Sequence, residues 1–151
     1  MNYILGIGSN LGNREQLIFT AIEQIKALPH CRCKKQSSII ETKPVGNTAQ
    51  PDFLNCAIEI EIKIKPEELM KACLRIEKKM GRARKIKWEP RLIDIDVILF
   101  EAGVYDSELI TLPHPECHQR KFVLQSLVEI CPDWVHPSNN KTIKKLYEEL
   151  S

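Results

Sequence analysis

The fold of this chain is organised around the stretch GRARKIKWEPRLIDIDVILF, residues 81–100. Its second half, LIDIDVILF, alternates apolar and acidic residues as a strand does, because successive side chains of a strand point to opposite faces. Asp94 and Asp96 therefore share one face, with their carboxylates about 7 Å apart. The opposite face of this predicted strand is apolar and carries Ile93, Ile95, Val97 and Leu99.

The two aspartates and the loop before them predict a site for a metal ion and phosphate groups. Neighbouring carboxylates repel each other, and a bound cation relieves that repulsion. Mg2+ prefers carboxylate oxygens and commonly binds substrate phosphates as well. The alternative is a solvated face of an antiparallel sheet, on which both aspartates are merely hydrated. The loop contains a single acid, Glu89. Its cations, which could bind phosphate, are Arg82, Arg84, Lys85, Lys87 and Arg91.

Length and composition indicate one globular domain. The 151 residues are enough for a compact core, and we expect a single domain over residues 1–151. The net charge of +2 is too small to indicate a nucleic-acid-binding protein. No apolar run approaches the ~18 residues of a membrane span, and the N-terminal sequence lacks the features of a secretory signal. We therefore expect a cytoplasmic protein.

The six cysteines indicate buried, reduced thiols, because none forms a C-x-x-C pair and most lie within apolar patterns. One short motif, HPECH at 114–118, contains three possible zinc ligands, His114, Cys117 and His118. The sequence offers no second ligand cluster at metal spacing, so zinc is the weaker alternative for this motif.

The order of the predicted elements indicates an α+β protein. Strands and helices follow one another as βαββαβ, which resembles the ferredoxin-like plan of an antiparallel sheet with helices packed on it. The predicted strands cover 3–8, 31–42, 53–65 and 92–100, and the predicted helices cover 18–28 and 66–80. Extra C-terminal elements follow: a short hairpin within 104–111 and helices at 119–130 and 142–150.

Three of these segments carry polar residues whose surroundings can be predicted. Along 53–65 isoleucines alternate with charged residues, so we expect Glu59 on the exposed face of a half-buried strand. On helix 66–80, Arg75 and Glu77 lie opposite the apolar stripe, where a solvated face is the ordinary interpretation. The glycine-rich turn at 8–13 lacks the third glycine of a dinucleotide-binding fingerprint. It is predicted to be structural, with Asn10 as a candidate site residue.

Five motifs occur in an order that resembles a known family. They are GIGSNLGN at 6–13, PDFLNCA at 51–57, RIEKKMGR at 75–82, WEPRLIDIDVILF at 88–100 and LPHPECHQRKFVL at 112–124. Together they are similar to the 6-hydroxymethyl-7,8-dihydropterin pyrophosphokinases of folate biosynthesis, over residues 4–137. The most specific part is P-R-x-[LI]-D-[LI]-D followed by P-H-P and R-x-F-V.

The resemblance implies a reaction and a set of residues. These enzymes transfer the β,γ-pyrophosphoryl group of ATP to the pterin hydroxymethyl group, release AMP and use two Mg2+ ions. Asp94 and Asp96 would bind both metals, and with Arg82 and Arg91 they would be the catalytic residues. The segment 82–91 would be a mobile loop over the phosphates. ATP would be held by Glu77, Arg84, Trp88, Arg91, Thr111, His114 and Arg120. The pterin would be held by Thr42, Pro44, Val45, Gly46, Phe53, Asn55 and Phe122.

Three positions depart from the family pattern. Glu89 stands where a small residue is frequent, Lys43 replaces a frequent proline, and Phe53 replaces a frequent tyrosine. The first adds negative charge to the phosphate-facing loop, and the last removes a phenol hydroxyl while keeping an aromatic face.

Two other classes of protein remain open: a non-catalytic ferredoxin-like nucleic-acid-binding module and another Mg-dependent nucleotidyl transferase. The near-neutral charge and the paired aspartates disfavour the first, because carboxylates repel phosphate unless a metal is bound. We expect small-molecule substrates, ATP and dihydropterin, for a monomer that binds neither nucleic acid nor a membrane.

Overall fold

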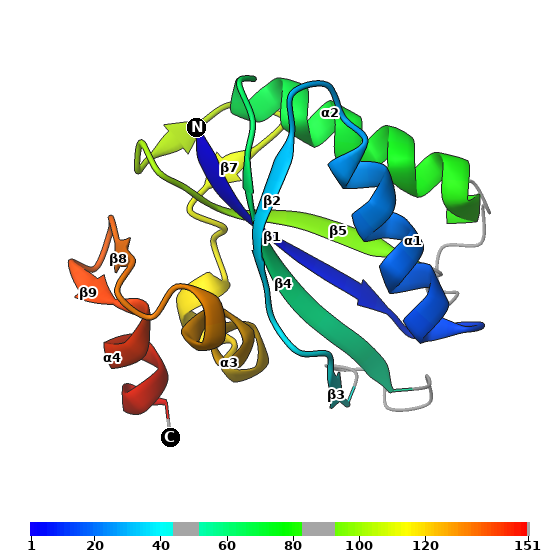
Figure 1. Cartoon of the computed structure of the whole chain (residues 1–151). Helices are drawn as coiled ribbons and strands as arrows, with labels where there is room; N and C mark the ends of the chain where they lie inside the picture. Colours follow the sequence, from blue (N-terminus) through cyan, green and yellow to red (C-terminus); the bar gives the residue numbers. More distant parts are fainter. Residues whose placement is uncertain (44–51, 83–92, 151) are drawn as a thin grey trace.

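The central feature of the molecule is an antiparallel sheet with the strand order β2-β4-β1-β5, and the short β3 also pairs with β4 (Figure 1). The computed structural model describes residues 1–43, 52–82 and 93–150. The strands are β1 (Asn2–Ser9), β2 (Arg32–Gln36), β3 (Ile40–Thr42), β4 (Phe53–Glu61) and β5 (Asp94–Phe100). The first and third strands of the βαββαβ pattern lie in the middle of the sheet. The predicted α+β, ferredoxin-like core is therefore confirmed.

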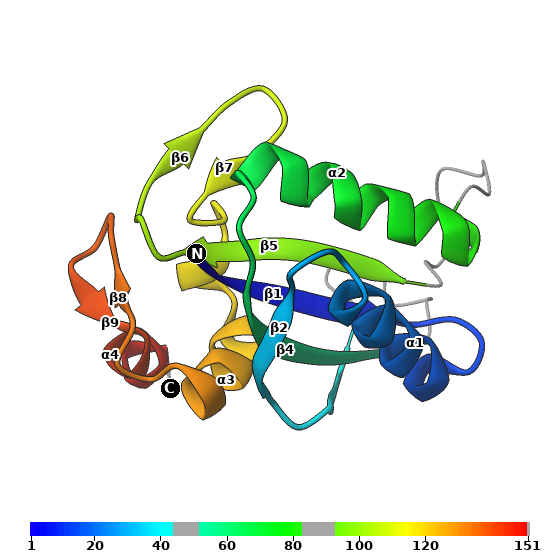
Figure 2. The ribbon, with the colours of Figure 1, turned by 45° about the horizontal axis from the view of Figure 1, so that its top comes forward.

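Two helices, α1 (Arg14–Lys26) and α2 (Pro66–Glu77), cover one face of this sheet (Figure 2). A π-helical turn, Lys78–Arg82, extends α2 as far as Gly81, whose φ of +106° favours glycine. The predicted left-handed glycine is thus confirmed, whereas α2 itself ends at Glu77, three residues before the predicted Met80. The buried stripes of the two helices pack on Tyr3, Leu5 and Ile7 of β1, and they consist of Ile18, Ala21, Ile22 and Ile25 from α1 and Leu69, Cys73 and Ile76 from α2.

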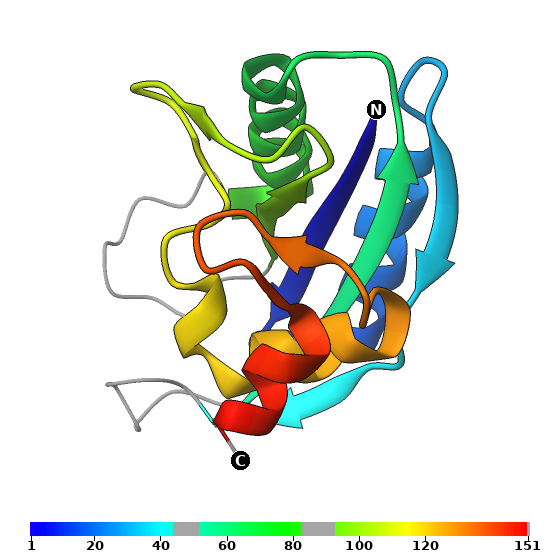
Figure 3. The same cartoon turned by 90° about the vertical axis from the view of Figure 1, so that its left-hand side faces the viewer.

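Two further helices, α3 (Lys121–Ile130) and α4 (Ile143–Glu149), lie on the opposite face (Figure 3). They form a second core with Ile4, Ala57 and Ile98 of the sheet. Glu59 lies on this same face and is only 7% exposed, with Lys34 Nζ 3.7 Å from its carboxylate. The prediction of an exposed Glu59 is therefore wrong, because helices from the end of the chain cover the face to which it points.

The predicted strand 31–42 is interrupted at Ser37 and Ser38. The hydroxyl oxygen of Ser37 accepts from the Ala57 amide at 2.8 Å, and Ser38 donates from its amide and its hydroxyl to the Glu129 carboxylate at 2.8 Å each. The Ser37 bond keeps the chain beside β4, whereas the Ser38 bonds attach it to α3, so regular strand pairing stops between β2 and β3. The predicted single strand is thus wrong, since β2 and β3 pair separately with β4.

The C-terminal region contains two small hairpins, β6 (Tyr105–Asp106) with β7 (Thr111–Leu112), and β8 (Val135–His136) with β9 (Lys141–Thr142). The first was predicted and the second was not. A 3-10 turn, Cys117–Gln119, precedes α3. Thr142 caps α4 as predicted, because its hydroxyl accepts from the Lys145 amide at 3.1 Å. The single domain over 1–151 stays a prediction.

Within the described ranges, no helix has the length and apolar character needed to cross a membrane.

Candidate active site

Three neighbouring strands align the candidate site residues in rows. Gly8 of β1 lies opposite Asp94 of β5 on one side and opposite Asn55 of β4 on the other. Two residues earlier in β1, Gly6 lies opposite Asp96. Because residues two apart share a face, both aspartates, both glycines and the amide lie on the side of the sheet that carries α3. The predicted common face of the two aspartates is confirmed.

The glycines form the floor of this site. A Cβ atom on Gly8 would lie 2.7 Å from Asn55 Oδ1, and one on Gly6 would lie 2.8 Å from Ile98 Cδ1. At Gly8 the absence of a side chain therefore lets the Asn55 amide lie over the strand. Neither glycine was among the predicted site residues. The available signal was their i, i+2 spacing in β1, which places them on one face.

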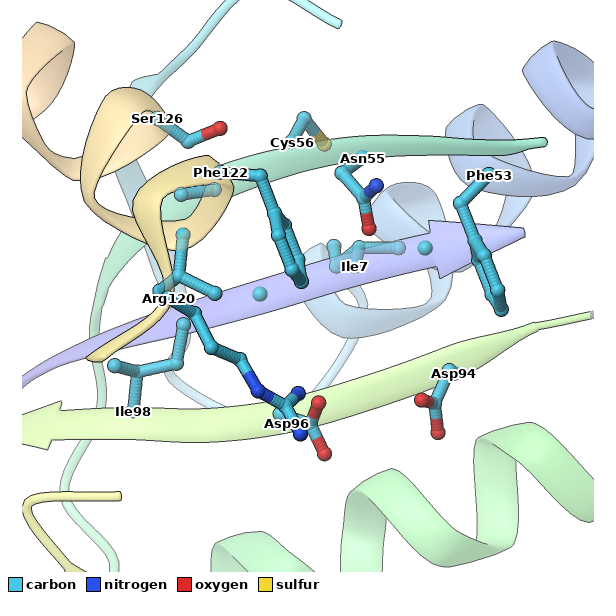
Figure 4. A pocket seen from close by; sticks show the side chains of 14 residues that line it. Ile7, Phe53, Asn55, Cys56, Asp94, Asp96, Ile98, Arg120, Phe122 and Ser126 are labelled. Carbon is cyan, nitrogen blue, oxygen red and sulfur yellow. The ribbon is translucent and has the colours of Figure 1, made fainter. Parts of the chain in front are cut away.

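Aromatic rings flank the amide. In Figure 4 the rings of Phe53 and Phe122 project into the same pocket, with Asn55 between them. Asn55 Nδ2 donates to Thr42 Oγ1 at 2.7 Å, which fixes the orientation of the amide. The pocket is open to solvent, and the space within it, including its open mouth, is about 480 Å³. Its lining also includes Cys56, Ala57, Asp94, Asp96, Ile98, Arg120, Val123 and Ser126.

A second, smaller pocket adjoins the first at Asp96. It is lined by Asp96, His114 and Arg120 among others, so the structure brings two of the predicted ATP residues beside one of the aspartates. Arg120 donates to the Glu116 carboxylate, its neighbour one turn earlier. His114 Nδ1 accepts from the Glu116 amide at 3.2 Å, so a neutral His114 ring carries its proton on Nε2. This arrangement offers hydrogen-bond donors to an anion next to the acidic pair.

Two other predicted ATP residues lie elsewhere. Thr111 belongs to β7, where its hydroxyl donates to Asp106 at 3.1 Å. Glu77 is 2% exposed, and its Oε2 accepts from the Ile95 amide at 2.7 Å. The interpretation of Glu77 as a residue of a solvated face is therefore wrong, because α2 places it against β5. A role for either residue in ATP binding stays a prediction.

Several predicted residues lie outside the part of the chain that the structure describes. Arg82 ends the π-helical turn that follows α2. The described ranges do not include Arg84, Trp88 and Arg91 of the predicted catalytic loop, or Pro44, Val45 and Gly46 of the predicted pterin segment.

Four of the cysteine thiols are buried and unreactive. Burial raises the pKa values of Cys56, Cys73, Cys117 and Cys131 to about 12, so these groups stay neutral at physiological pH. In the HPECH motif, Cys117 is buried in the second core. The His118 ring packs edge-on against His136, with the ring centroids 5.5 Å apart. Among the described residues no group of three or more His, Cys, Asp or Glu side chains could hold a metal.

Comparison with known proteins supports the resemblance noted in the sequence. The sequence profile of the family 7,8-dihydro-6-hydroxymethylpterin-pyrophosphokinase (HPPK) matches residues 4–132. The chain is 41% identical over 131 residues to 2-amino-4-hydroxy-6-hydroxymethyldihydropteridine pyrophosphokinase of Methylorubrum extorquens, covering 87% of this chain and 83% of that protein. With the Bacillus subtilis protein of the same name it is 39% identical, covering 84% of this chain and 76% of that protein.

Longer proteins match as well. The chain is 38% identical to folic acid synthesis protein fol1 of Schizosaccharomyces pombe over 97% of its own length, but it spans only 20% of that protein. A crystal structure of Plasmodium falciparum HPPK-DHPS with pteroate matches 99% of this chain and 42% of that one, with a TM-score of 0.79 and 14% identity. At that identity the structural likeness supports the fold alone.

The fold and these relatives define the class of the protein, an ATP-dependent pyrophosphokinase. Specifically, the chain belongs to the 7,8-dihydro-6-hydroxymethylpterin-pyrophosphokinase family.

Proposed function

We propose that the pocket above β1, β4 and β5 is where this chain transfers pyrophosphate from ATP to the hydroxymethyl group of 6-hydroxymethyl-7,8-dihydropterin. The pterin hydroxyl oxygen forms a bond to the β-phosphorus and releases its proton to solvent, and the bond from that phosphorus to the oxygen retained by AMP breaks. The observation that carries this assignment is the alignment of Asp94 and Asp96 beside a pocket flanked by Phe53 and Phe122. This placement puts two carboxylates that can bind cations next to a space between two aromatic rings that suits a flat ring.

The pterin is proposed to lie between the two phenylalanine rings. A planar heterocycle gains most from aromatic faces and from a few amide partners at its edge. Asn55 is such an amide partner, and its hydrogen bond to Thr42 fixes its orientation. Pro44, Val45 and Gly46 are proposed to complete this subsite.

The metal ions are assigned to Asp94 and Asp96. Their carboxylates are hard oxygen donors on one face, which suits Mg2+ shared with phosphate oxygens. Two bound Mg2+ ions would neutralise phosphate charge during the transfer. The contribution of the chain is to hold these donors in adjacent rows of a sheet, so that their geometry is set before ATP binds.

ATP is proposed to bind across Asp96 toward His114 and Arg120. An arginine guanidinium and an imidazole N–H both donate to phosphate oxygens. Glu77, Arg84, Trp88, Arg91 and Thr111 are assigned to ATP as well, and Arg82 and Arg91 to the transferred group. Catalysis of this kind rests mainly on positioning and charge neutralisation.

Product analysis tests this function. The protein is incubated with ATP, Mg2+ and the dihydropterin, and the nucleotide products are separated. We expect one AMP per pterin diphosphate, and an Asp96→Ala variant as control should form both products at least ~100-fold more slowly. Release of inorganic pyrophosphate with a nucleotidylated product would indicate a nucleotidyl transferase instead. Absence of turnover together with RNA or DNA binding would indicate a nucleic-acid module.

Three further expectations concern the oligomeric state, nucleic-acid binding and cellular location of the protein. The protein is expected to act as a monomer, without nucleic acid, in the cytoplasm. Sedimentation analysis of the purified chain, with and without ATP and pterin, tests the first of these directly.

A further inference from the structure

Arg14, the first residue of α1, makes two hydrogen bonds from a single nitrogen atom. Its Nη1 donates to Glu41 Oε2 at 2.9 Å and to the Asp52 carbonyl oxygen at 2.8 Å. Glu41 belongs to β3, and Asp52 is the residue immediately before β4. One guanidinium therefore links α1, β3 and the start of β4.

The two acceptors lie next to residues of the proposed pterin subsite. Glu41 directly precedes Thr42, and Asp52 directly precedes Phe53. Thr42 and Phe53 are themselves opposite each other in the pairing of β3 with β4, and Thr42 accepts from Asn55. Arg14 thus joins the two strands at the end where they contribute to the pocket.

Among the described residues, the strand pairing that supports this junction is short. The strand β3 has three residues and pairs with β4 alone among the described strands, so its ladder is short. Arg14 is 30% exposed and Glu41 54% exposed, and exposed ion pairs of this kind contribute little to overall stability. Removal of Arg14 should therefore leave the protein folded while loosening the local register of Thr42 and Phe53.

We propose that Arg14 is a positioning residue for the pterin: it holds the β3–β4 end so that Thr42, Phe53 and Asn55 face the ring together. This inference rests on the proposed function of the pocket. Arg14 acts through its neighbours and makes no contact with ATP in this assignment. Its loss is expected to weaken pterin binding selectively.

The test compares Arg14→Ala and Arg14→Lys with a matched control, Arg32→Ala. Arg32 also forms an arginine–glutamate ion pair on this sheet, with Glu61 at 3.6 Å, but at the far end of β4 from the pocket. For each variant we would measure kcat, KM for pterin, KM for ATP and melting temperature. Binding of 6-hydroxymethylpterin is measured by its fluorescence, with a non-hydrolysable ATP analogue and Mg2+ present.

We expect Arg14→Ala to weaken pterin binding roughly tenfold, the scale of one charge-assisted hydrogen bond, while KM for ATP stays within about twofold. Arg14→Lys keeps a cationic donor and should recover most of the loss. Arg32→Ala should match the unmodified protein. Equal behaviour of the two alanine variants, or equal losses for pterin and ATP, would overturn the inference. If the unmodified protein itself binds no pterin and releases no AMP, the proposed function fails instead.

Discussion

The Glu77 carboxylate accepts a hydrogen bond from the backbone amide of Ile95 at 2.7 Å, and Ile95 separates the two aspartates of the pocket. In the described sheet β5 is an edge strand, so its outward amides need partners from outside the sheet. Glu77 supplies one from α2. This bond ties the strand that carries Asp94 and Asp96 to the helix behind it.

Replacing Glu77 should therefore affect stability and activity together. Glu77→Ala leaves a buried amide without its acceptor, and we expect a loss of about 1–3 kcal/mol in the free energy of unfolding. Glu77→Gln retains an acceptor oxygen and should lose less. Urea unfolding and kcat of both variants provide the check, with the exposed Glu23→Ala as control. A Glu77→Ala protein as stable as that control would contradict the assigned bond.

Removal of either aspartate should abolish most of the activity without unfolding the protein. Asp94→Ala and Asp96→Ala are each expected to lower kcat at least ~100-fold, the scale of a lost strong transition-state contact. The fold should persist, because removing one of two like charges relieves repulsion. Turnover at saturating Mg2+ and the melting temperature are measured, with the exposed Asp133→Ala as control. Near-normal turnover of Asp96→Ala would refute the metal assignment.

Phe122 should contribute to pterin binding far more than to ATP binding. Phe122→Ala is expected to weaken pterin binding by about 1–3 kcal/mol, the value for stacking of a base on an aromatic side chain. Calorimetric titration with each ligand tests this. Phe19 on α1, which is 42% exposed, provides the matched control as Phe19→Ala. Equal losses for pterin and ATP would instead identify Phe122 as a packing residue.

Gly8 should be less tolerant of a methyl group than Gly6. The added Cβ in Gly8→Ala would meet the amide oxygen of Asn55 at 2.7 Å, whereas in Gly6→Ala it would meet the flexible end of Ile98 at 2.8 Å. We expect Gly8→Ala to raise KM for pterin by roughly tenfold, since overpacking costs about 1–3 kcal/mol, and Gly6→Ala to raise it less. Steady-state kinetics of the two variants measure KM for pterin. A larger increase in Gly6→Ala than in Gly8→Ala would disprove the role assigned to Gly8.

His136 should make the protein less stable in mild acid. Burial, and then the neighbouring His118, lower the pKa of His136. The unfolded chain therefore binds more protons than the folded chain as pH falls through the ordinary histidine pKa of about 6.5, and the free energy of unfolding decreases there. His136→Asn keeps an acceptor for the Ser138 amide, which donates to His136 Nδ1 at 3.2 Å. Urea unfolding at pH 7.5 and pH 5 should show a smaller pH-dependent loss in this variant than in the unmodified protein. An identical loss in both would contradict the prediction.

Local patterns were sufficient to predict the facing of the two aspartates, the start of α2 and the left-handed glycine that follows it. Asp94 and Asp96 share a face because the two-residue period of a strand is a property of the backbone at that point. Pro66 opens the helix, and Gly81, with its positive φ, lies in the π-helical turn that follows it, since both residues act within one turn of chain. The motifs also predicted Phe53, Asn55 and Phe122 as pterin residues, through resemblance rather than through periodicity, and these three residues line one pocket.

Burial could not be predicted in the same way. Glu59 and Glu77 occupy positions that an isolated strand or helix would expose, and they are buried because α3 and β5 pack against them. The break at Ser37 and Ser38 likewise depends on Glu129, which α3 brings from far along the chain. Residue spacing sets the direction of a side chain relative to its own backbone. Whether that direction leads to water, to a core or to a second ring such as Phe122 beside Phe53 depends on surfaces that distant segments contribute after folding.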